Sequence, residues 1–432
     1  MNRIILIGNG FDKAHGLPTG YDDFINNYWK YIVSELEHCK SYEYKDGLCT
    51  LTLLYENITN GAIRTWEDFM RSSRVMRYDT AHEKIEYIKQ AEMYCRVQKT
   101  SFLSEIDKAI ETKKWVDIEN KYYDFLKDIA TQNRACKYNS VEELNKELEI
   151  LKSYLIAYLN DIRLDDRIVM PCIRQTMYGP FIYKEVSIEK EGVFWQFVKD
   201  RWDKANSTED DDKIGFLAQF GEHFAEEEFN TYKRMLTLDE HMRNIFENTE
   251  VPNYYLLPNS VMLLDFNYTA TSSLYINKLF TQIPRLSLIE INHIHGELSG
   301  SEEIIFGYGD DIDEEYARIE RLNENAYLDN IKVFHYLSSP NYRRMLEFIE
   351  SAPYQIYIMG HSCGTSDRTL LNTLFEHDNC VSIKPFYYQK EDGSDNYREL
   401  VQNISRNFKD KRLMRDKVVN KKYCEPLPQI GK

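Results

Sequence analysis

Short apolar runs near both ends of the chain predict the strands of a buried sheet. Residues 3–8 form an apolar run that stops at Gly8, which is typical of a strand covered on both faces in a parallel sheet. Leu370, Leu371, Leu374 and Phe375 show helical spacing nearer the other end, so strands and helices should alternate there. The later apolar runs are residues 261–266, 286–295, 303–306, 354–359 and 381–388.

The middle of the chain shows a helical pattern instead. From Tyr21 to about Pro252, apolar residues recur every three or four positions among many Glu and Lys and few Pro or Gly. The pattern predicts an α/β domain with a parallel sheet, built from residues 1–25 and 255–432 and split in sequence by a large all-helical insertion at 26–254. The clearest helix has a capping pair, Ser140 and Glu143, followed by Leu144, Leu148, Leu151, Leu155 and Leu159.

Length, charge and cysteine usage narrow the class of protein. The 432 residues exceed one hydrophobic core, and a content of 43% hydrophobic and 13% aromatic residues predicts a folded chain. The net charge of −16 disfavours bulk nucleic-acid binding, since that affinity depends on clustered Lys and Arg. The eight cysteines form no Cys-x-x-Cys pair, and no run of eighteen apolar residues occurs. We therefore expect a cytoplasmic protein with no membrane segment.

The first predicted strand leads into a glycine turn. Gly8 and Gly10 lie at its carboxyl end, where glycines let backbone N–H groups approach a pyrophosphate. Lys13 stands where the dehydrogenase fingerprint needs a third glycine, and the Walker pattern is absent, which disfavours hydride transfer and P-loop hydrolysis. The turn predicts a nucleotide site, with a purely structural turn as the alternative.

Polar residues also follow three later strands, at the ends where open α/β sheets bind ligands. Histidine is suited to proton transfer near neutral pH. His293 and His295 share one strand face, but a third ligand at a recognisable spacing is missing, so no metal is predicted. The candidates are Asn267 after residues 261–266, His295 at the end of 286–295, and Gly360, His361, Ser362 and Asp367 after 354–359.

Residues 360–364 also match the Gly-x-Ser-x-Gly pattern of a serine nucleophile. In that fold an acid and then a histidine follow the serine, whereas the downstream His377 falls inside the predicted helix. A serine hydrolase that uses Ser362 is therefore the weaker interpretation. The other is a helix start that binds phosphate or ribose through its N–H groups and the hydroxyls of Ser362 and its neighbours.

Together these motifs resemble the AbiH family of bacterial abortive-infection proteins. The resemblance implies an antiviral protein that acts during bacteriophage infection. It is carried by residues 5–12, 15–18 and 115–119, by Asn267, Tyr268 and Thr269, by His295 and Gly296, and by Gly360, His361 and Ser362 with Asp367.

The order of the motifs is also similar, more distantly, to that of sirtuins and sirtuin-like NAD-cleaving defence proteins. This implies a Rossmann-like (sirtuin-like) domain that binds NAD as ligand or substrate. Zinc-binding cysteine pairs are missing, so NAD hydrolysis is implied rather than protein deacylation. The implied roles are His295 as base, Asn267 in the catalytic pocket, Gly8 and Gly10 at the pyrophosphate, and Gly360 and Ser362 near the adenosine half. We add Asp12 as a third catalytic candidate, and Asn9, Phe11, His361 and Asp367 as cofactor contacts.

A second class of function stays open beside the enzyme. The chain would then be a nonenzymatic nucleotide-sensing or interaction protein whose helical insertion binds a phage or host partner. A phage-encoded trigger protein and a homo-oligomer are further partners that the sequence leaves open.

Overall fold

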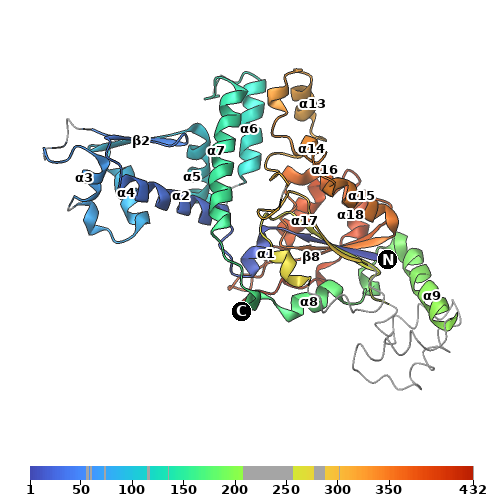
Figure 1. Cartoon of the computed structure of the whole chain (residues 1–432). Coiled ribbons are helices and arrows are strands. Elements are labelled where there is room, and N and C mark those ends of the chain that lie inside the picture. The colour runs from blue at the N-terminus through green and yellow to red at the C-terminus, as the bar shows by residue number, and fades with distance from the viewer. Residues whose placement is uncertain are drawn as a thin grey trace. The chain divides into compact units, whose positions relative to one another are not determined.

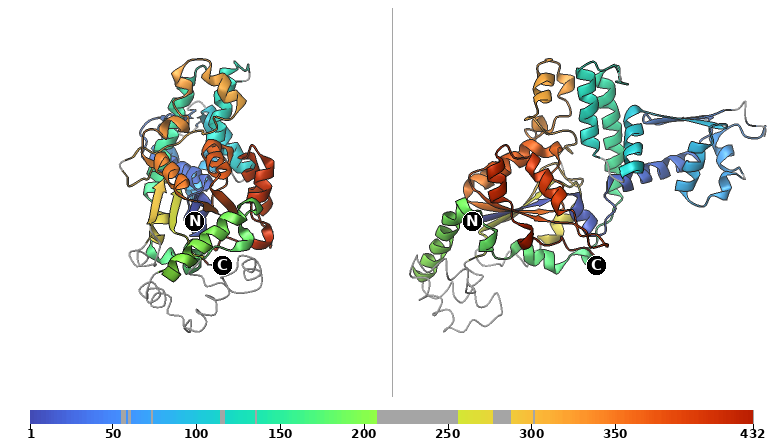
Figure 2. Two further views of the ribbon diagram at one scale, coloured as in Figure 1. Left: turned by 90° about the vertical axis from the view of Figure 1, so that its right-hand side faces the viewer. Right: turned by 180° about the vertical axis from the view of Figure 1, so that it is seen from behind.

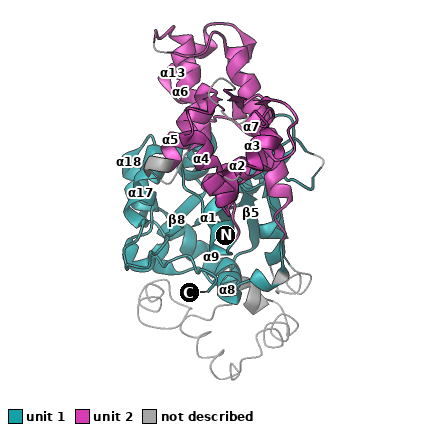
Figure 3. Cartoon of the chain, turned by 90° about the vertical axis from the view of Figure 1, so that its left-hand side faces the viewer, with its two compact units in different colours: residues 1–16, 164–304, 336–432 teal, residues 17–163, 305–335 magenta. Residues whose placement is uncertain are grey.

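The computed structural model describes residues 1–54, 58, 61–72, 74–113, 117–134, 136–207, 256–276, 288–300 and 302–431. Within it the chain forms two compact units, coloured in Figure 3. The first, here called the sheet unit, comprises Met1–Gly16, Leu164–Ile304 and Tyr336–Lys432. The second, here called the helical unit, comprises Leu17–Arg163 and Ile305–His335. None of the described helices is both long and apolar enough to cross a membrane.

The sheet unit contains a five-stranded sheet of order β6-β5-β1-β7-β8. Each neighbouring pair is parallel, which confirms the predicted parallel sheet of an α/β domain. The two ends of the chain meet in it, because β1 lies between β5 and β7. The strands are β1 (Asn2–Ile7), β5 (Ser260–Asp265), β6 (Leu288–His293), β7 (Tyr354–Met359) and β8 (Cys380–Phe386).

Residues 303–306 are not a strand, so that prediction was wrong. Ile304, Ile305 and Phe306 are buried in an irregular segment. A short apolar run indicates burial, and burial alone does not distinguish a strand from a packed loop.

Both faces of the sheet are covered by helices (Figures 1 and 2). One core joins Ile5 and Ile7 of β1 to Phe11 of α1 and to Ile173 and Met177 of α8. Alternate strand residues point to opposite faces, so the fully buried Ile4 and Leu6 belong to the other face. The α-helices of this unit are α1 (Asn9–Ala14), α8 (Pro171–Tyr178), α9 (Glu191–Ser207), α15 (Asn341–Ser351), α16 (Arg368–Glu376), α17 (Tyr397–Arg406) and α18 (Lys411–Lys417).

The helical unit is not all-helical, which corrects the predicted insertion. It contains a three-stranded antiparallel sheet of β2 (Glu43–Lys45), β3 (Cys49–Leu53) and β4 (Cys95–Lys99). Residues 49–53 alternate buried and half-buried positions, the period-two signal of a strand with one covered face. Its α-helices are α2 (Tyr21–Leu36), α3 (Trp66–Met70), α4 (Ala81–Gln90), α5 (Ser101–Lys113), α6 (Ile118–Ala130), α7 (Val141–Asn160), α13 (Glu314–Glu320) and α14 (Lys332–His335).

Local signals predicted α7 correctly. Ser140 is its N-cap and accepts a hydrogen bond from the backbone N–H of Glu143, as the capping pattern predicts. Leu144, Leu148 and Leu151 lie on its buried face. This helix could be predicted because every signal in it comes from residues within two turns of one another.

The unit boundaries differ from residues 25 and 255. Residues 164–207 lie with the sheet, and residues 305–335 lie with the helices. Glu119 of α6 connects residues 305–335 to the rest of the helical unit. Its carboxylate accepts hydrogen bonds from Gly307 N (3.2 Å) and Lys332 Nζ (3.0 Å). Glu119 belongs to the 115–119 motif, of which Trp115 and Val116 lie outside the described residues.

Candidate functional site

The polar turns predicted at four strand ends lie together at the carboxyl edge of the parallel sheet. Backbone hydrogen bonds link them: Phe266 N donates to Ile7 O (2.9 Å), and Ile294 N donates to Asp265 O (3.0 Å). On the other side, Gly10 N donates to Gly360 O (2.9 Å). The fold therefore brings the candidates after β1, β5, β6 and β7 to one place.

The glycine turn is packed against the loop after β7. A Cβ at Gly8 would lie 2.6 Å from the Cα of His361, and a Cβ at Gly10 would lie 2.7 Å from the carbonyl oxygen of Gly360. Gly360 itself has a φ of +81°, and a Cβ there would lie 2.0 Å from Phe11 N. The three glycines are thus required by the close contact of two protein loops.

The N–H groups of this turn are engaged within the protein. Gly8 N donates to Met359 O, Gly10 N to Gly360 O and Phe11 N to Gly8 O. These groups were expected to face a pyrophosphate. A phosphate bound here would need donors from other residues.

Two further candidates from this turn have different surroundings. The Phe11 side chain is fully buried in the core, where its ring lies 4.5 Å from that of His15 and 5.5 Å from that of Tyr275. Asn9 is exposed at the first position of α1. Of the two, Asn9 is the one whose side chain a ligand can reach.

Asp12 is a buried carboxyl group with one free oxygen. It is 1% exposed, and its Oδ2 accepts a hydrogen bond from Thr269 Oγ1 at 2.6 Å. Burial raises its pKa to about 6, although hydrogen bonding by Thr269 opposes the rise. Oδ1 has no hydrogen-bond partner among the residues that the structure describes.

Asn267 lies beside this carboxyl group. Its backbone N–H donates to Asp265 Oδ1 (2.8 Å), which orients the turn after β5. Its side chain lowers the pKa of Asp12, so the two groups are neighbours. Yet the Asn267 Nδ2 group completes no hydrogen bond within the described part of the chain.

Asp265 and His293 complete a set that we call the carboxyl-edge cluster. Burial raises the pKa of Asp265 well above its usual value, and the charge of Asp12 raises it further. His293 Nδ1 lies 3.7 Å from Asp265 Oδ2, and burial lowers the pKa of the imidazole. Four buried atoms of the cluster complete no hydrogen bond of normal geometry within the described residues: Asp12 Oδ1, Asp265 Oδ2, Asn267 Nδ2 and His293 Nδ1. The side chains of Thr271 and Asn267 still lie close enough to Asp12, and that of Ser272 close enough to Asp265, to lower the pKa of those carboxyl groups.

Unpaired buried polar atoms cost free energy, of the order of 1–3 kcal/mol each. A cluster of them in a native protein needs an explanation, and a bound ligand or water supplies one. The sequence singled out Asp12 and Asn267 here but not Asp265, although Asp265 ends a predicted strand at this edge.

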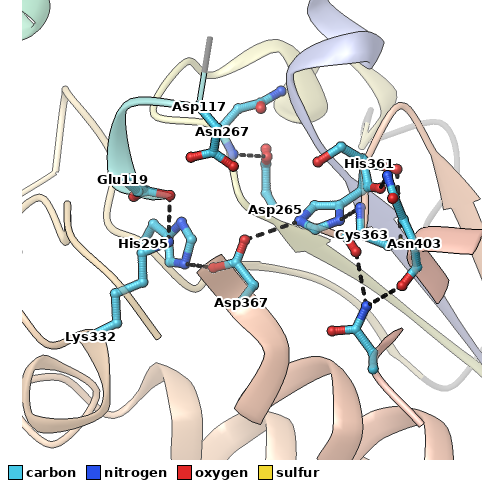
Figure 4. Close-up of polar contacts among 12 residues, drawn as sticks. Asp117, Glu119, Asp265, Asn267, His295, Lys332, His361, Cys363, Asp367 and Asn403 are labelled. Atoms are coloured by element: carbon cyan, nitrogen blue, oxygen red, sulfur yellow. Dashed lines mark hydrogen bonds and ion pairs between the residues drawn. The ribbon is translucent and has the colours of Figure 1, made fainter. Parts of the chain in front are cut away.

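His295 and His361 face one carboxylate, as Figure 4 shows. His295 Nε2 lies 3.2 Å from Asp367 Oδ1, and His361 Nε2 lies 3.6 Å from Asp367 Oδ2. All three residues are less than 8% exposed. Phe266 packs against both rings, with centroids 5.2 Å from His295 and 4.1 Å from His361.

Two more groups fix these rings. Cys363 N donates to His361 Nδ1 (3.0 Å), and the Tyr336 hydroxyl lies 3.4 Å from His295 Nε2. Tyr336 was not found from the sequence, since it lies 41 residues from His295 in no recognisable motif. The two candidate histidines are therefore held rather than free to rotate.

Ser362 does not have the surroundings of an activated serine. Its side chain is exposed, and its carbonyl oxygen accepts a hydrogen bond from Asn403 Nδ2. The left-handed residues of this turn are Gly360 and Cys363, with φ values of +81° and +53°, and not the serine. His377 lies just after α16 and not inside it, and its Nε2 lies 3.3 Å from Glu350.

The two histidines considered as a metal pair point to different groups. His293 contacts Asp265 and Glu297, whereas His295 contacts Asp367. Over the described residues, no group of three or more His, Cys, Asp or Glu side chains is arranged to hold a metal ion.

Comparison with known proteins gave one match. The model of the family described as bacteriophage abortive infection AbiH matches residues 4–389. Searches of curated proteins and of solved structures gave no match. The matched span begins within β1, extends beyond β8 and includes every candidate residue of the carboxyl edge.

Proposed function

Because the chain belongs to the AbiH family of bacteriophage abortive-infection proteins, we propose that it defends cells by binding NAD or a related nucleotide and hydrolysing it. The family indicates antiviral defence. Loss of NAD would arrest an infected cell before the phage completes its cycle.

The strand order supports a Rossmann-like, sirtuin-like nucleotide domain. Numbered within the sheet alone, β6-β5-β1-β7-β8 has the order 3-2-1-4-5. This is the order of doubly wound dinucleotide-binding sheets, which bind ligands at the carboxyl ends of their strands. The candidates after β1, β5, β6 and β7 all lie at that edge.

One observation carries the proposal: the carboxyl-edge cluster holds buried polar atoms that the described protein does not satisfy. Asp12 Oδ1 is an acceptor and Asn267 Nδ2 is a donor. A ligand group that offers both a donor and an acceptor, such as a ribose hydroxyl or a carboxamide, would pair with both. Two carboxyl groups, Asp12 and Asp265, disfavour an anion here. We therefore assign the cluster to the nicotinamide-ribose part of the ligand, which carries a cationic pyridinium ring and no anionic group.

The reaction needs few protein groups. Water attacks C1′ of the nicotinamide ribose, the C1′–N bond breaks, and its electron pair leaves with neutral nicotinamide. His295 takes the proton of the water, and Asn267 and Asp12 orient the ribose. The proton later passes to solvent, so the products are ADP-ribose, nicotinamide and one proton.

The test measures NAD and ATP over time after purified protein is added to an extract of phage-infected cells. We expect NAD loss with the wild type and at least 100-fold slower loss with His295→Ala. Ser362→Ala is the control, because its exposed hydroxyl has no part in this reaction, and it should consume NAD at the wild-type rate.

Other outcomes separate the alternatives. NAD loss that is unchanged in His295→Ala would refute the assigned base. Constant NAD in every sample, with growth arrest still dependent on the protein in cells, would favour nonenzymatic nucleotide sensing. Covalent labelling of the wild type, but not of Ser362→Ala, by a fluorophosphonate would indicate serine hydrolase chemistry.

A further inference from the structure

The carboxylate of Asp367 lies between two imidazoles that come from different strand ends. His295 follows β6 and His361 follows β7, and each presents its Nε2 to a different oxygen of Asp367 (Figure 4). Asp367 is 7% exposed. It is the last residue of the short 3₁₀ turn Thr365–Asp367, which precedes α16. From its place after β7, Asp367 was expected to contact the cofactor.

The tautomer of His361 follows from its hydrogen bond. Its Nδ1 accepts the backbone N–H of Cys363, so in the neutral ring the proton is on Nε2. That N–H faces Asp367 Oδ2 at 3.6 Å. Each oxygen of the Asp367 carboxylate therefore faces one imidazole nitrogen. Consistent with a charged Asp367, its field adds to burial in raising the pKa of the Cys363 thiol.

The same reasoning applies to His295. An ionised carboxylate can only accept hydrogen bonds, and Asp367 Oδ1 lies 3.2 Å from His295 Nε2. The Tyr336 hydroxyl lies farther from this nitrogen, at 3.4 Å, and a hydroxyl can accept from an Nε2–H as well as donate. With Asp367 ionised, the proton of the neutral His295 ring belongs on Nε2, so Nδ1 is the nitrogen that carries none. A carboxylate behind an imidazole also stabilises the imidazolium that proton transfer creates.

We propose that Asp367 is a positioning residue, which holds the Nε2 proton of His295 so that Nδ1 is the base, and that it does not bind the nucleotide. The part concerning catalysis rests on the proposed NAD hydrolysis, whereas the part concerning the tautomer does not. In the reaction the water proton passes to His295 Nδ1, and Asp367 stays ionised throughout.

The first test is the tautomer itself. Protein labelled with ¹⁵N-histidine is studied by long-range ¹H–¹⁵N correlation at pH 8, with His295→Ala used to assign the His295 signals among the 10 histidines. We expect His295 to carry its proton on Nε2 in the wild type. A wild-type ring protonated on Nδ1 would overturn the proposal whether or not the protein consumes NAD.

The second test uses Asp367→Asn, which keeps the shape but removes the charge. We expect His295 to lose its single tautomer, and NAD turnover to fall about 100-fold in kcat with KM changed less than about twofold. Asp367→Glu should restore part of kcat. A rise in KM at unchanged kcat would instead assign Asp367 to nucleotide binding and overturn the proposal.

Asp107→Asn is the matched control. Asp107 is another buried carboxylate, paired with Lys99 Nζ (2.6 Å) and Trp29 Nε1 (3.1 Å) in the helical unit. Its loss should lower stability but leave the His295 tautomer and kcat unchanged. If Asp367→Asn fails to fold, the wild-type tautomer still decides the question. If no sample consumes NAD, the hydrolase proposal fails while the tautomer measurement stands.

Discussion

Two clusters of buried polar groups in the sheet unit differ in how fully they are paired. The Arg3 network comprises Arg3, Glu185, Gln355 and Lys384. Arg3 donates to the carbonyl oxygens of Met177 (3.1 Å) and Gly179 (2.7 Å), and Lys384 Nζ lies 2.7 Å from Glu185 Oε1. In this network one polar atom, Arg3 Nε, has no partner among the described residues.

In the carboxyl-edge cluster, Asp12, Asp265 and Asn267 are buried and His293 is partly exposed. Each of the four members has one buried atom without a hydrogen bond of normal geometry, counted over the described residues. This difference in hydrogen bonding indicates which of the two clusters is the candidate for ligand binding. The Arg3 network is satisfied by the protein itself and attaches residues 177–185 to the strands. The carboxyl-edge cluster keeps buried atoms that the described residues leave without a hydrogen bond of normal geometry, and a bound ligand or water would account for them.

The largest expected effect comes from breaking the paired cluster. Glu185→Ala removes the nearer carboxylate of the buried Lys384 ammonium, which keeps only Glu425 at 3.5 Å. It also removes one of the two acceptors of Gln355 Nε2 and leaves Ser382 Oγ as the other. We expect the free energy of unfolding to fall by about 3–5 kcal/mol, measured by denaturant unfolding.

The control is Glu189→Ala, which removes an exposed ion pair with Arg412 and should cost less than about 1 kcal/mol. A loss below about 1 kcal/mol for Glu185→Ala would show that the Arg3 network is not a structural anchor. The contrast with the carboxyl edge would then disappear.

At the carboxyl edge we expect a substitution to raise the free energy of unfolding instead of lowering it. Folding raises the pKa of Asp12 to about 6, so the folded state binds its proton more tightly than the unfolded state. This group's contribution to stability is therefore full at acid pH and is lost as pH rises toward and through 6. Asp12→Asn replaces the carboxyl group with an amide that does not ionise, so the variant does not lose this stability as pH rises. We expect it to stabilise the protein by about 2–3 kcal/mol at pH 8 and by much less at pH 4, while NAD consumption is abolished.

Denaturant unfolding of both proteins at the two pH values, with NAD assays beside it, measures both halves of this prediction. Stabilisation with full activity would show that Asp12 has no functional role. Destabilisation at pH 8 would show that its carboxylate is needed by the fold, which would contradict the comparison.

The smallest effect concerns the Thr269 hydroxyl. Thr269→Val removes the hydrogen bond to Asp12 Oδ2 and so raises the pKa of that carboxyl group further. We expect a stability loss of about 1 kcal/mol and an acid limb of the NAD-hydrolysis profile shifted upward by less than about one pH unit.

Thr373→Val serves as its control, because that hydroxyl donates to a backbone carbonyl, Thr369 O, within α16. It should leave the pH profile unchanged. An unshifted profile in Thr269→Val would mean that Asp12 does not set the acid limb.

Much of the sheet unit could be predicted from local patterns, but the helical unit could not. Apolar runs located β1, β5, β6, β7 and β8, because strands buried on both faces are continuously apolar. The same rule wrongly predicted a strand at residues 303–306. The small sheet of β2, β3 and β4 was missed because its strands are short and lie between long helical patterns, although residues 49–53 alternate.

In the candidate site, too, some features could be predicted from the sequence and others could not. Asp12, Asn267, His295 and Asp367 could be found because each follows a predicted strand or turn in the chain. The pairing of His295 with Asp367 could not, because 72 residues separate them and no local rule joins one strand end to the turn after another. Tyr336 became visible only through its contacts, and so did the roles of Thr269 and Asp265 beside Asp12.

The sequence by itself determined the elements of the sheet and the identity of the polar groups at their ends, because apolar periodicity and capping act over a few residues. Tertiary structure decided what those groups do. In the folded chain, N–H groups of the glycine turn donate to the loop after β7, and Asp367 lies between two histidines. Asp12 and Asn267 each keep a buried atom without a hydrogen bond among the described residues. The reason is physical: hydrogen-bond satisfaction, tautomer and pKa depend on neighbours in space, and parallel strands bring those neighbours from distant parts of the chain.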